Sequence, residues 1–221
     1  MRTLVLALAL VATAMPLAAQ HTNHGTAGEH SEHTHVKGTL PAGWLARFDR
    51  ANASLDQVYF HFMEGHFHVT TGPSGIFYTP DNVATGEYRA RASFTQREAS
   101  RHPEAYGLFV GGQNLDSPEQ DYLYFLVRQD GKFLVKHRYG AETRTLVDWT
   151  SHEAVVALDD AGQATNVLEV HAHEGGVRFL VNGTEVASLP RAPMVNTDGI
   201  VGFRINHNLD VRIDHFEIVR D

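Results

Sequence analysis

Arginine and amide side chains recur at alternate positions along segments that read as β-strands. Planar guanidinium groups bind carboxylates, sulfates and pairs of sugar hydroxyls, because their donors lie in a fixed fork. If the strands that carry them are neighbours in one sheet, they form a polar face that binds a carbohydrate or another small polar ligand. The candidate residues are Arg89, Arg91, Arg128, Arg204, Asn206 and Asn208.

Three aromatic side chains belong to the same hypothesis. Tyr78, Tyr124 and Trp149 offer flat apolar surfaces against which a sugar ring stacks. The alternative interpretation is that outward arginines only solvate an exposed sheet face and pair with Asp and Glu nearby, which is the ordinary case. Both interpretations stay open on the sequence alone.

Three histidines beyond the N-terminal region suit a metal site. His66 and His68 are two residues apart and so share one face of a strand, and His207 could join them from another strand. A three-histidine site with an open position activates water. Against this, His207 has the same strand phase as Phe203 and Ile205, which fits a hydrogen-bonded core histidine.

A second group of histidines precedes these in a polar segment without hydrophobic periodicity. Such a segment buries too little apolar surface to fold, so we expect it to be disordered and to bind zinc, copper or nickel only loosely. For the whole chain, the sequence allows a divalent metal cofactor, which would be zinc, copper or calcium, and does not require one. The histidines of this tail are His21, His24, His30, His33 and His35.

The elements that must position these residues alternate with period two. In the run 86–96, Tyr88, Ala90, Ala92 and Phe94 share one face, which predicts a half-buried strand. Asp130-Gly131 and Asn182-Gly183 separate β-rich runs and predict hairpins. Further strands are expected at 106–110, 122–128, 133–139, 167–173, 177–181, 185–189, 199–208 and 211–219.

No segment beyond the first residues has a convincing helical period. A dozen or more short strands with glycine-rich turns predict an all-β, two-sheet antiparallel β-sandwich. The chain has 221 residues, which is enough for one such domain. We expect it to occupy residues 40–221.

The N-terminal residues read as an export signal. Arg2 precedes an apolar run at 4–14 that is too short to span a bilayer, and small residues follow it, so we expect a signal peptide over 1–19. The histidine-rich tail then covers 20–39. The chain has no cysteine, so its core must hold the fold without disulfides. Secretion or a periplasmic location is the prediction.

Charge excludes two classes of partner. The formal net charge is −8, whereas nucleic acid and anionic lipid both require a basic surface. We expect no nucleic-acid partner, and no membrane association once the signal is cleaved.

The strand runs resemble those of the concanavalin A-like lectin/glucanase superfamily. The likeness lies in YGLFVGGQNL…DYLYFLVRQDGKFLVKHRYG…TLVDW (106–149), NVLEVHAHEGGVRFLVNGTEV (166–186) and DGIVGFRINHNLDVRIDHFEI (198–218). Within it, the chain looks most similar to laminin-G-like modules and to 3-keto-disaccharide hydrolase domains of exported bacterial proteins. The resemblance implies a jelly roll over residues 40–221.

The resemblance leaves function open, because one sandwich hosts lectins, hydrolases, lyases and adhesion modules. Family 16 glucanases of this fold carry Glu-x-Asp-x-(x)-Glu on one strand, and no such spacing occurs here. A sugar-binding module is favoured. A sugar hydrolase or lyase that uses His66, His68 and His207 is the first alternative, and an adhesion module with a metal-buffering tail is the second.

Overall fold

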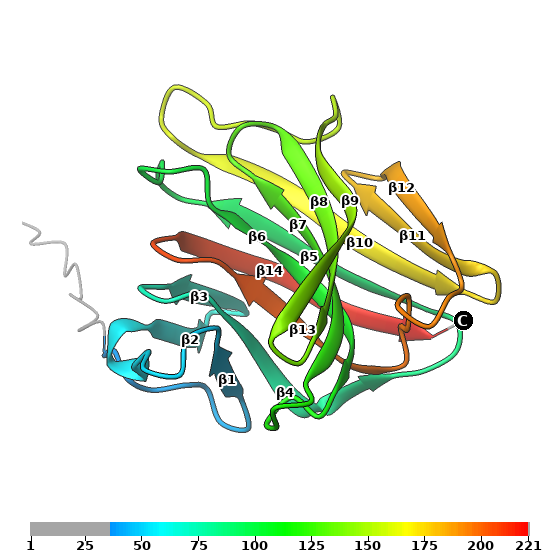
Figure 1. Ribbon diagram of the computed structural model, residues 1–221. Coiled ribbons are helices and arrows are strands. Elements are labelled where there is room, and N and C mark those ends of the chain that lie inside the picture. The colour runs from blue at the N-terminus through cyan, green and yellow to red at the C-terminus, as the bar shows by residue number, and fades with distance from the viewer. Residues whose placement is uncertain (1–35, 221) are drawn as a thin grey trace, which may run out of the picture. The chain divides into compact units, whose positions relative to one another are not determined.

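The computed structural model describes residues 36–220 and contains two antiparallel sheets of seven strands (Figure 1). The predicted signal peptide (1–19) and most of the predicted histidine-rich tail (20–39) lie outside the described residues. Sheet A has the order β1 (Leu45–Phe48), β4 (Gly75–Ala84), β13 (Gly199–Ile205), β6 (Ala105–Gln113), β7 (Asp121–Arg128), β8 (Lys132–Tyr139) and β9 (Glu142–Ser151).

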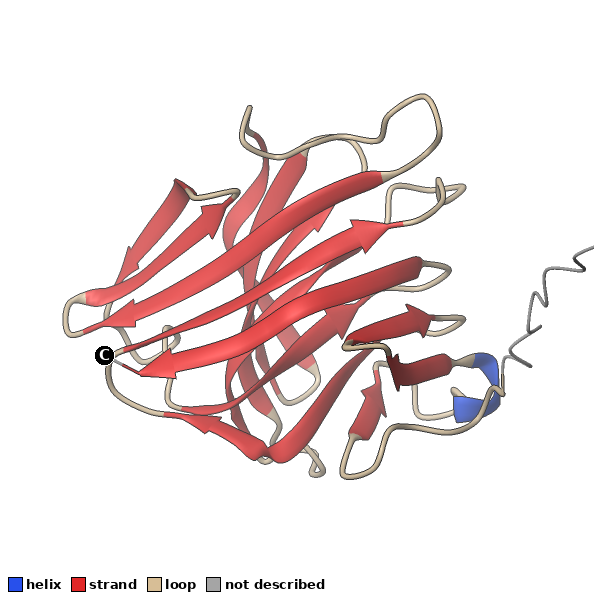
Figure 2. Ribbon diagram, turned by 180° about the vertical axis from the view of Figure 1, so that it is seen from behind, coloured by secondary structure: helices blue, strands red, loops and turns tan. Residues whose placement is uncertain are grey.

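Sheet B lies behind sheet A, and its strands are seen side by side from the back (Figure 2). A 3-10 turn at Leu55–Gln57 leads into this sheet. Among residues 36–220 no helix is long and apolar enough to cross a membrane. Its strand order is β12 (Thr184–Pro190), β11 (Gly176–Val181), β10 (Ala164–His173), β5 (Tyr88–Gln96), β14 (Asp210–Arg220), β3 (His66–Thr70) and β2 (Tyr59–Met63).

The core lies between the two sheets and is made by the period-two alternation. On β5, Tyr88, Ala90, Ala92 and Phe94 are fully buried, as the sequence predicts. Phe203 of sheet A packs across the gap against Phe94 and contributes to an aromatic group at one end of the core. The all-β, two-sheet antiparallel sandwich is confirmed.

The predicted hairpin turns are confirmed by their backbone. Asn182 and Gly183 have φ of 51° and 80°, and Gly131 has φ of 76°. Positive φ suits asparagine and glycine because their side chains are small or absent. These turns join β11 to β12 and β7 to β8, so they set the register of both hairpins.

A second apolar cluster lies on the outer face of sheet A. Tyr78, Phe109, Tyr122, Tyr124 and Leu126 belong to it and are separated from the main core by the sheet itself. The outer face of sheet A is therefore apolar at its centre, unlike the outer face of sheet B, where β5 exposes Arg89 and Arg91.

Candidate functional site

The structure places the predicted arginines on opposite outer faces of the sandwich. Arg89 and Arg91 lie on β5 in sheet B, whereas Arg128 on β7 and Arg204 on β13 lie in sheet A. The expectation of one shared polar face is wrong, because β5 is hydrogen-bonded between β10 and β14 and neighbours neither β7 nor β13.

The two asparagines that follow Arg204 do not extend its strand. β13 ends at Ile205, so Asn206 and Asn208 lie in the loop to β14. The amide of Asn206 donates to the carbonyl of Ala105 at 2.9 Å, and Asn208 has φ of 56°. The alternation predicted over 199–208 therefore stops three residues early.

The aromatic candidates on sheet A are largely occupied by the protein. Tyr78 and Tyr124 are 4% and 6% exposed. Arg128 donates from Nε and Nη2 to the carboxylate of Asp130 and lies 4.2 Å over the ring of Trp149. Tyr78 and Tyr124 belong to one apolar cluster of sheet A against which Trp149 packs, on the opposite side of the sandwich from the arginines of β5.

Arg204, which is buried, forms an ion pair with the partly exposed Asp49 from the loop after β1. Its Nη1 and Nη2 donate to the two carboxylate oxygens at 2.6 and 2.5 Å, and its guanidinium lies 5.6 Å from the Tyr124 ring centre. Burial raises the pKa of Asp49, but the hydrogen bonds and charge of Arg204 outweigh burial and hold it below its usual value. Burial raises the pKa of the Tyr124 hydroxyl to about 12.

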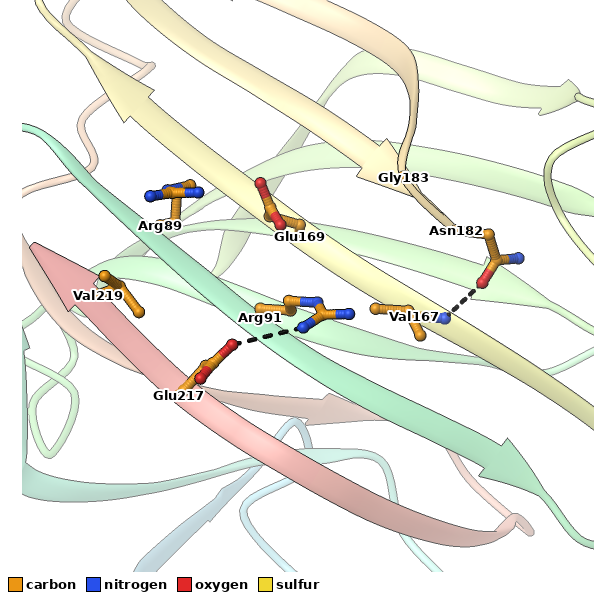
Figure 3. Close-up of a pocket in the computed structure, with 8 residues that line it drawn as sticks. All are labelled: Arg89, Arg91, Val167, Glu169, Asn182, Gly183, Glu217 and Val219. Atoms are coloured by element: carbon orange, nitrogen blue, oxygen red, sulfur yellow. Dashed lines mark hydrogen bonds and ion pairs between the residues drawn. The ribbon is translucent and has the colours of Figure 1, made fainter. Parts of the chain in front are cut away.

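A pocket of about 520 Å³ lies on the outer face of sheet B and contains both arginines of β5 (Figure 3). Arg91 is at its centre. In the strand register Arg91 stands opposite Glu169 of β10 on one side and opposite Glu217 of β14 on the other. Arg91 Nη1 lies 3.5 Å from Glu217 Oε1, and about half of each side chain is exposed. The row therefore alternates acceptor, donor and acceptor across three strands.

A bulge in β14 places Glu217 in this row. Three steps along β14, from Asp214 to Glu217, match only two along β5, from Ser93 to Arg91. The bulge contains one extra residue and includes His215, whose backbone is left-handed with φ of 53°. Phe216 consequently packs inward on Phe203, with ring centres 4.7 Å apart, and Glu217 points outward.

The turn between β11 and β12 closes one end of the pocket. Asn182 Oδ1 accepts from the amide of Val167 at 2.8 Å, and its Nδ2 donates to the carbonyl of Ala154 at 2.8 Å. These bonds hold the turn against β10. Val167 and Val219 add apolar surface at the two flanks of the charged row (Figure 3).

The pocket is balanced in charge. Its lining carries two guanidinium groups, Arg89 and Arg91, and two carboxylates, Glu169 and Glu217. The two arginines are among the residues predicted from the sequence, whereas the two carboxylates are not. The alternation of β10 points Glu169 outward, but its position opposite Arg91 depends on a strand order that no local pattern encodes.

The histidines are not brought together. His66 and His68 lie on β3, where His68 Nε2 is 2.8 Å from Asp210 Oδ1. His207 lies in the loop after β13, and its Nδ1 is 2.7 Å from Glu104 Oε2. Within residues 36–220 no group of three or more His, Cys, Asp or Glu side chains could hold a metal. The five tail histidines lie outside the described residues, and their loose metal binding stays a prediction.

Solved structures share this architecture. A carbohydrate-binding module, CBM66, from Bacillus subtilis matches with a TM-score of 0.59 at 8% identity, over 82% of this chain and 98% of that chain. A protein of unknown function with a galectin-like fold from Bacillus subtilis matches with a TM-score of 0.58 at 14% identity, over 80% and 89%. The chain has a concanavalin A-like lectin/glucanase-type fold.

A larger protein contains the same fold. The GH43 protein BlXynB from Bacillus licheniformis matches with a TM-score of 0.51 at 14% identity, over 84% of this chain but only 38% of that chain. No family model and no curated protein sequence matches the chain. The confirmed jelly roll therefore rests on the structure, and the finer likeness to laminin-G-like modules and 3-keto-disaccharide hydrolases stays a resemblance.

Proposed function

We propose that this domain binds a carbohydrate, and that the pocket around Arg91 on sheet B is the binding surface. The observation that carries the proposal is the row Glu169, Arg91 and Glu217, which presents acceptors and donors side by side on three strands. The fold shared with CBM66, a carbohydrate-binding module by name, supports it.

Sugar hydroxyls match this row because each hydroxyl both donates and accepts a hydrogen bond. A guanidinium fork and a neighbouring carboxylate can engage two adjacent hydroxyls. The contact between Arg91 and Glu217 is long, at 3.5 Å, and exposed, so it adds little stability and is readily exchanged for ligand contacts. Val167 and Val219 offer apolar surface to the C–H groups of a ring.

The balance of charge favours a neutral sugar. Two arginines and two glutamates line the pocket, so a carboxylate or sulfate placed beside Arg91 would also face Glu169 and Glu217. Like charges at such distances oppose binding. We therefore propose a neutral oligosaccharide as the ligand of this surface.

We also propose that the protein is exported, on the separate basis of its N-terminal sequence.

A glycan array with the full chain, followed by calorimetry on each bound sugar, tests the proposal. Arg91→Ala and Glu169→Gln should each weaken binding of the neutral sugar about tenfold, equivalent to ~1.4 kcal/mol. Arg178→Ala is the matched control, because Arg178 also lies on sheet B and pairs with a glutamate, Glu185, at 3.8 Å with similar exposure. Equal losses in all three variants would contradict the assignment of the pocket.

Mass spectrometry of each bound sugar separates the alternatives. An unchanged sugar after prolonged incubation supports a binding module. A cleaved sugar would indicate the hydrolase or lyase alternative. Absence of any bound glycan on the array would favour an adhesion module.

A further inference from the structure

A second polar cavity lies at one end of sheet A, remote from the pocket on sheet B. Its volume is about 520 Å³, and it is bounded by β1 and the loop after it, by Pro118 and Gln120, and by the turn between β8 and β9. The charged groups in its lining are Arg47, Asp49, Arg50 and Arg138. None of these arginines belongs to the set suggested by alternation in the sequence.

Positive charge exceeds negative charge in this cavity. Asp49 is the one carboxylate among the described lining residues, and Arg204 engages both of its oxygens. Arg138 Nη1 reaches the same carboxylate only at 3.9 Å. Asp49 is therefore neutralised by Arg204, and the charges of the three lining arginines remain.

Two of these arginines are held by main-chain carbonyls. Arg47 Nη1 donates to the carbonyl of Leu115 at 2.9 Å, and Arg138 Nε donates to the carbonyl of Gly140 at 2.8 Å. A carbonyl fixes the side chain without cancelling its charge. Each guanidinium keeps further N–H donors for a ligand.

Arg50 completes the cationic set and is exposed. Within residues 36–220, no carboxylate lies within 4 Å of Arg47 or Arg50. Two acidic residues follow in the nearby loop but are outside the cavity lining. Glu119 accepts a hydrogen bond from the Ser117 hydroxyl. Burial and the negative charge of Asp116 raise the pKa of the Tyr78 hydroxyl.

We propose that this cavity binds an oxyanion, a carboxylate or sulfate group carried on a small polar molecule. Several arginines that line one cavity favour a planar or tetrahedral anion with two or more oxygens, because each guanidinium fork can donate to an oxygen pair. The ionic character of the contacts makes the affinity dependent on salt. The proposal uses residues separate from those of the neutral-sugar pocket, so either can fail without the other.

Calorimetry with three probes tests the proposal on the full chain. Sulfate, glucuronate and glucose separate the two anion sources from the sugar ring. We expect sulfate or glucuronate to bind and glucose not to bind at this cavity. Raising sodium chloride from low concentration to 0.5 M shortens the screening length about threefold. The affinity for the anion should then fall at least tenfold.

Variants connect the binding to the cavity. Arg50→Glu should abolish anion binding. Because the Arg50 side chain is exposed, this substitution should not disturb folding, so misfolding would not account for the loss of binding. Arg138→Ala should weaken binding tenfold or more. Arg178→Glu, on sheet B, changes the net charge by the same amount as Arg50→Glu and should leave the anion affinity unchanged.

The outcomes decide between the proposal and a general charge effect. Loss of binding in Arg50→Glu but not in Arg178→Glu supports the cavity. Equal losses in both variants, or no heat with either anion, would overturn it. Binding of only one anion identifies which of the two groups the site accepts.

Discussion

The ion pair between Asp49 and Arg204 joins the loop after β1 to the strand β13. The Arg204 side chain is 9% exposed and that of Asp49 30%. Removing one partner of such a pair leaves the other charge without compensation, which costs more than the pair contributes. The free-energy cost is largest when the charge left unpaired is the more buried one, which here is the Arg204 guanidinium.

Asp49→Asn should therefore lower the free energy of unfolding by about 3 kcal/mol. Urea unfolding at neutral pH measures the change. Glu217→Gln removes the partner of Arg91 in an exposed pair and should cost less than about 1 kcal/mol. Similar losses in the two variants would show that burial of Arg204 is not the cause.

The same pair gives a prediction for pH. Because Arg204 holds the pKa of Asp49 below the value of about 3.9 found in unfolded chains, the unfolded chain takes up this proton first. Stability from the pair is complete above that value and is lost as pH falls through the lowered pKa. The difference in unfolding free energy between the natural chain and Asp49→Asn should be constant above about pH 5 and shrink below about pH 4.

A series of urea titrations from neutral to acidic pH measures this difference. A gap between the two proteins that stayed constant down to the acid limit would contradict a lowered pKa for Asp49.

At the scale of elements, the bulge in β14 connects the core to the candidate site. It turns Phe216 inward and Glu217 outward within two consecutive residues. A strand of strict alternation would place Asp214 and Phe216 on the same face. The left-handed backbone of His215 resolves this conflict.

His215→Val should destabilise the protein by at least about 1 kcal/mol, because a β-branched residue resists positive φ. It should also weaken binding of the neutral sugar, since Glu217 depends on the bulge. His215→Gly, which suits that backbone, should change stability by less than about 1 kcal/mol. Thermal unfolding and calorimetry on both variants give the comparison, and identical behaviour of the two would exclude backbone strain as the cause.

Local patterns predict most strands but not every one. β5 follows from the alternation of Tyr88 to Phe94, and the hairpins follow from Asp130-Gly131 and Asn182-Gly183. β4 is not predicted, because Pro80 interrupts its pattern, and the ladder with β13 is itself irregular between Tyr78 and Val83. Proline has no amide to donate to a ladder.

At the scale of the molecule, the fold could be predicted and the site only in part. Alternation tells which residues of a strand face outward, and Arg91 and Arg204 do. It does not tell which sheet a strand joins, and pairings such as Arg91 with Glu217 link residues far apart in sequence. For the same reason Asp49 could not be matched to Arg204.

The two proposed sites lie on different sheets and share no residue, so they should act independently. Saturation of the cavity on sheet A with sulfate should change the affinity of the pocket for a neutral sugar by less than about 0.5 kcal/mol. Calorimetry of the sugar with and without the anion measures the coupling. A larger change would indicate that the sheets transmit strain between their outer faces.

The placement of Arg91 and Arg138 on opposite layers of the sandwich has a consequence for valence. A chain that holds a neutral sugar on one layer and an anionic group on the other is bifunctional as a single copy. Such a molecule can hold a sugar and a small anionic molecule at the same time without forming a dimer, so the amount of each that is brought together would follow the concentration of the chain.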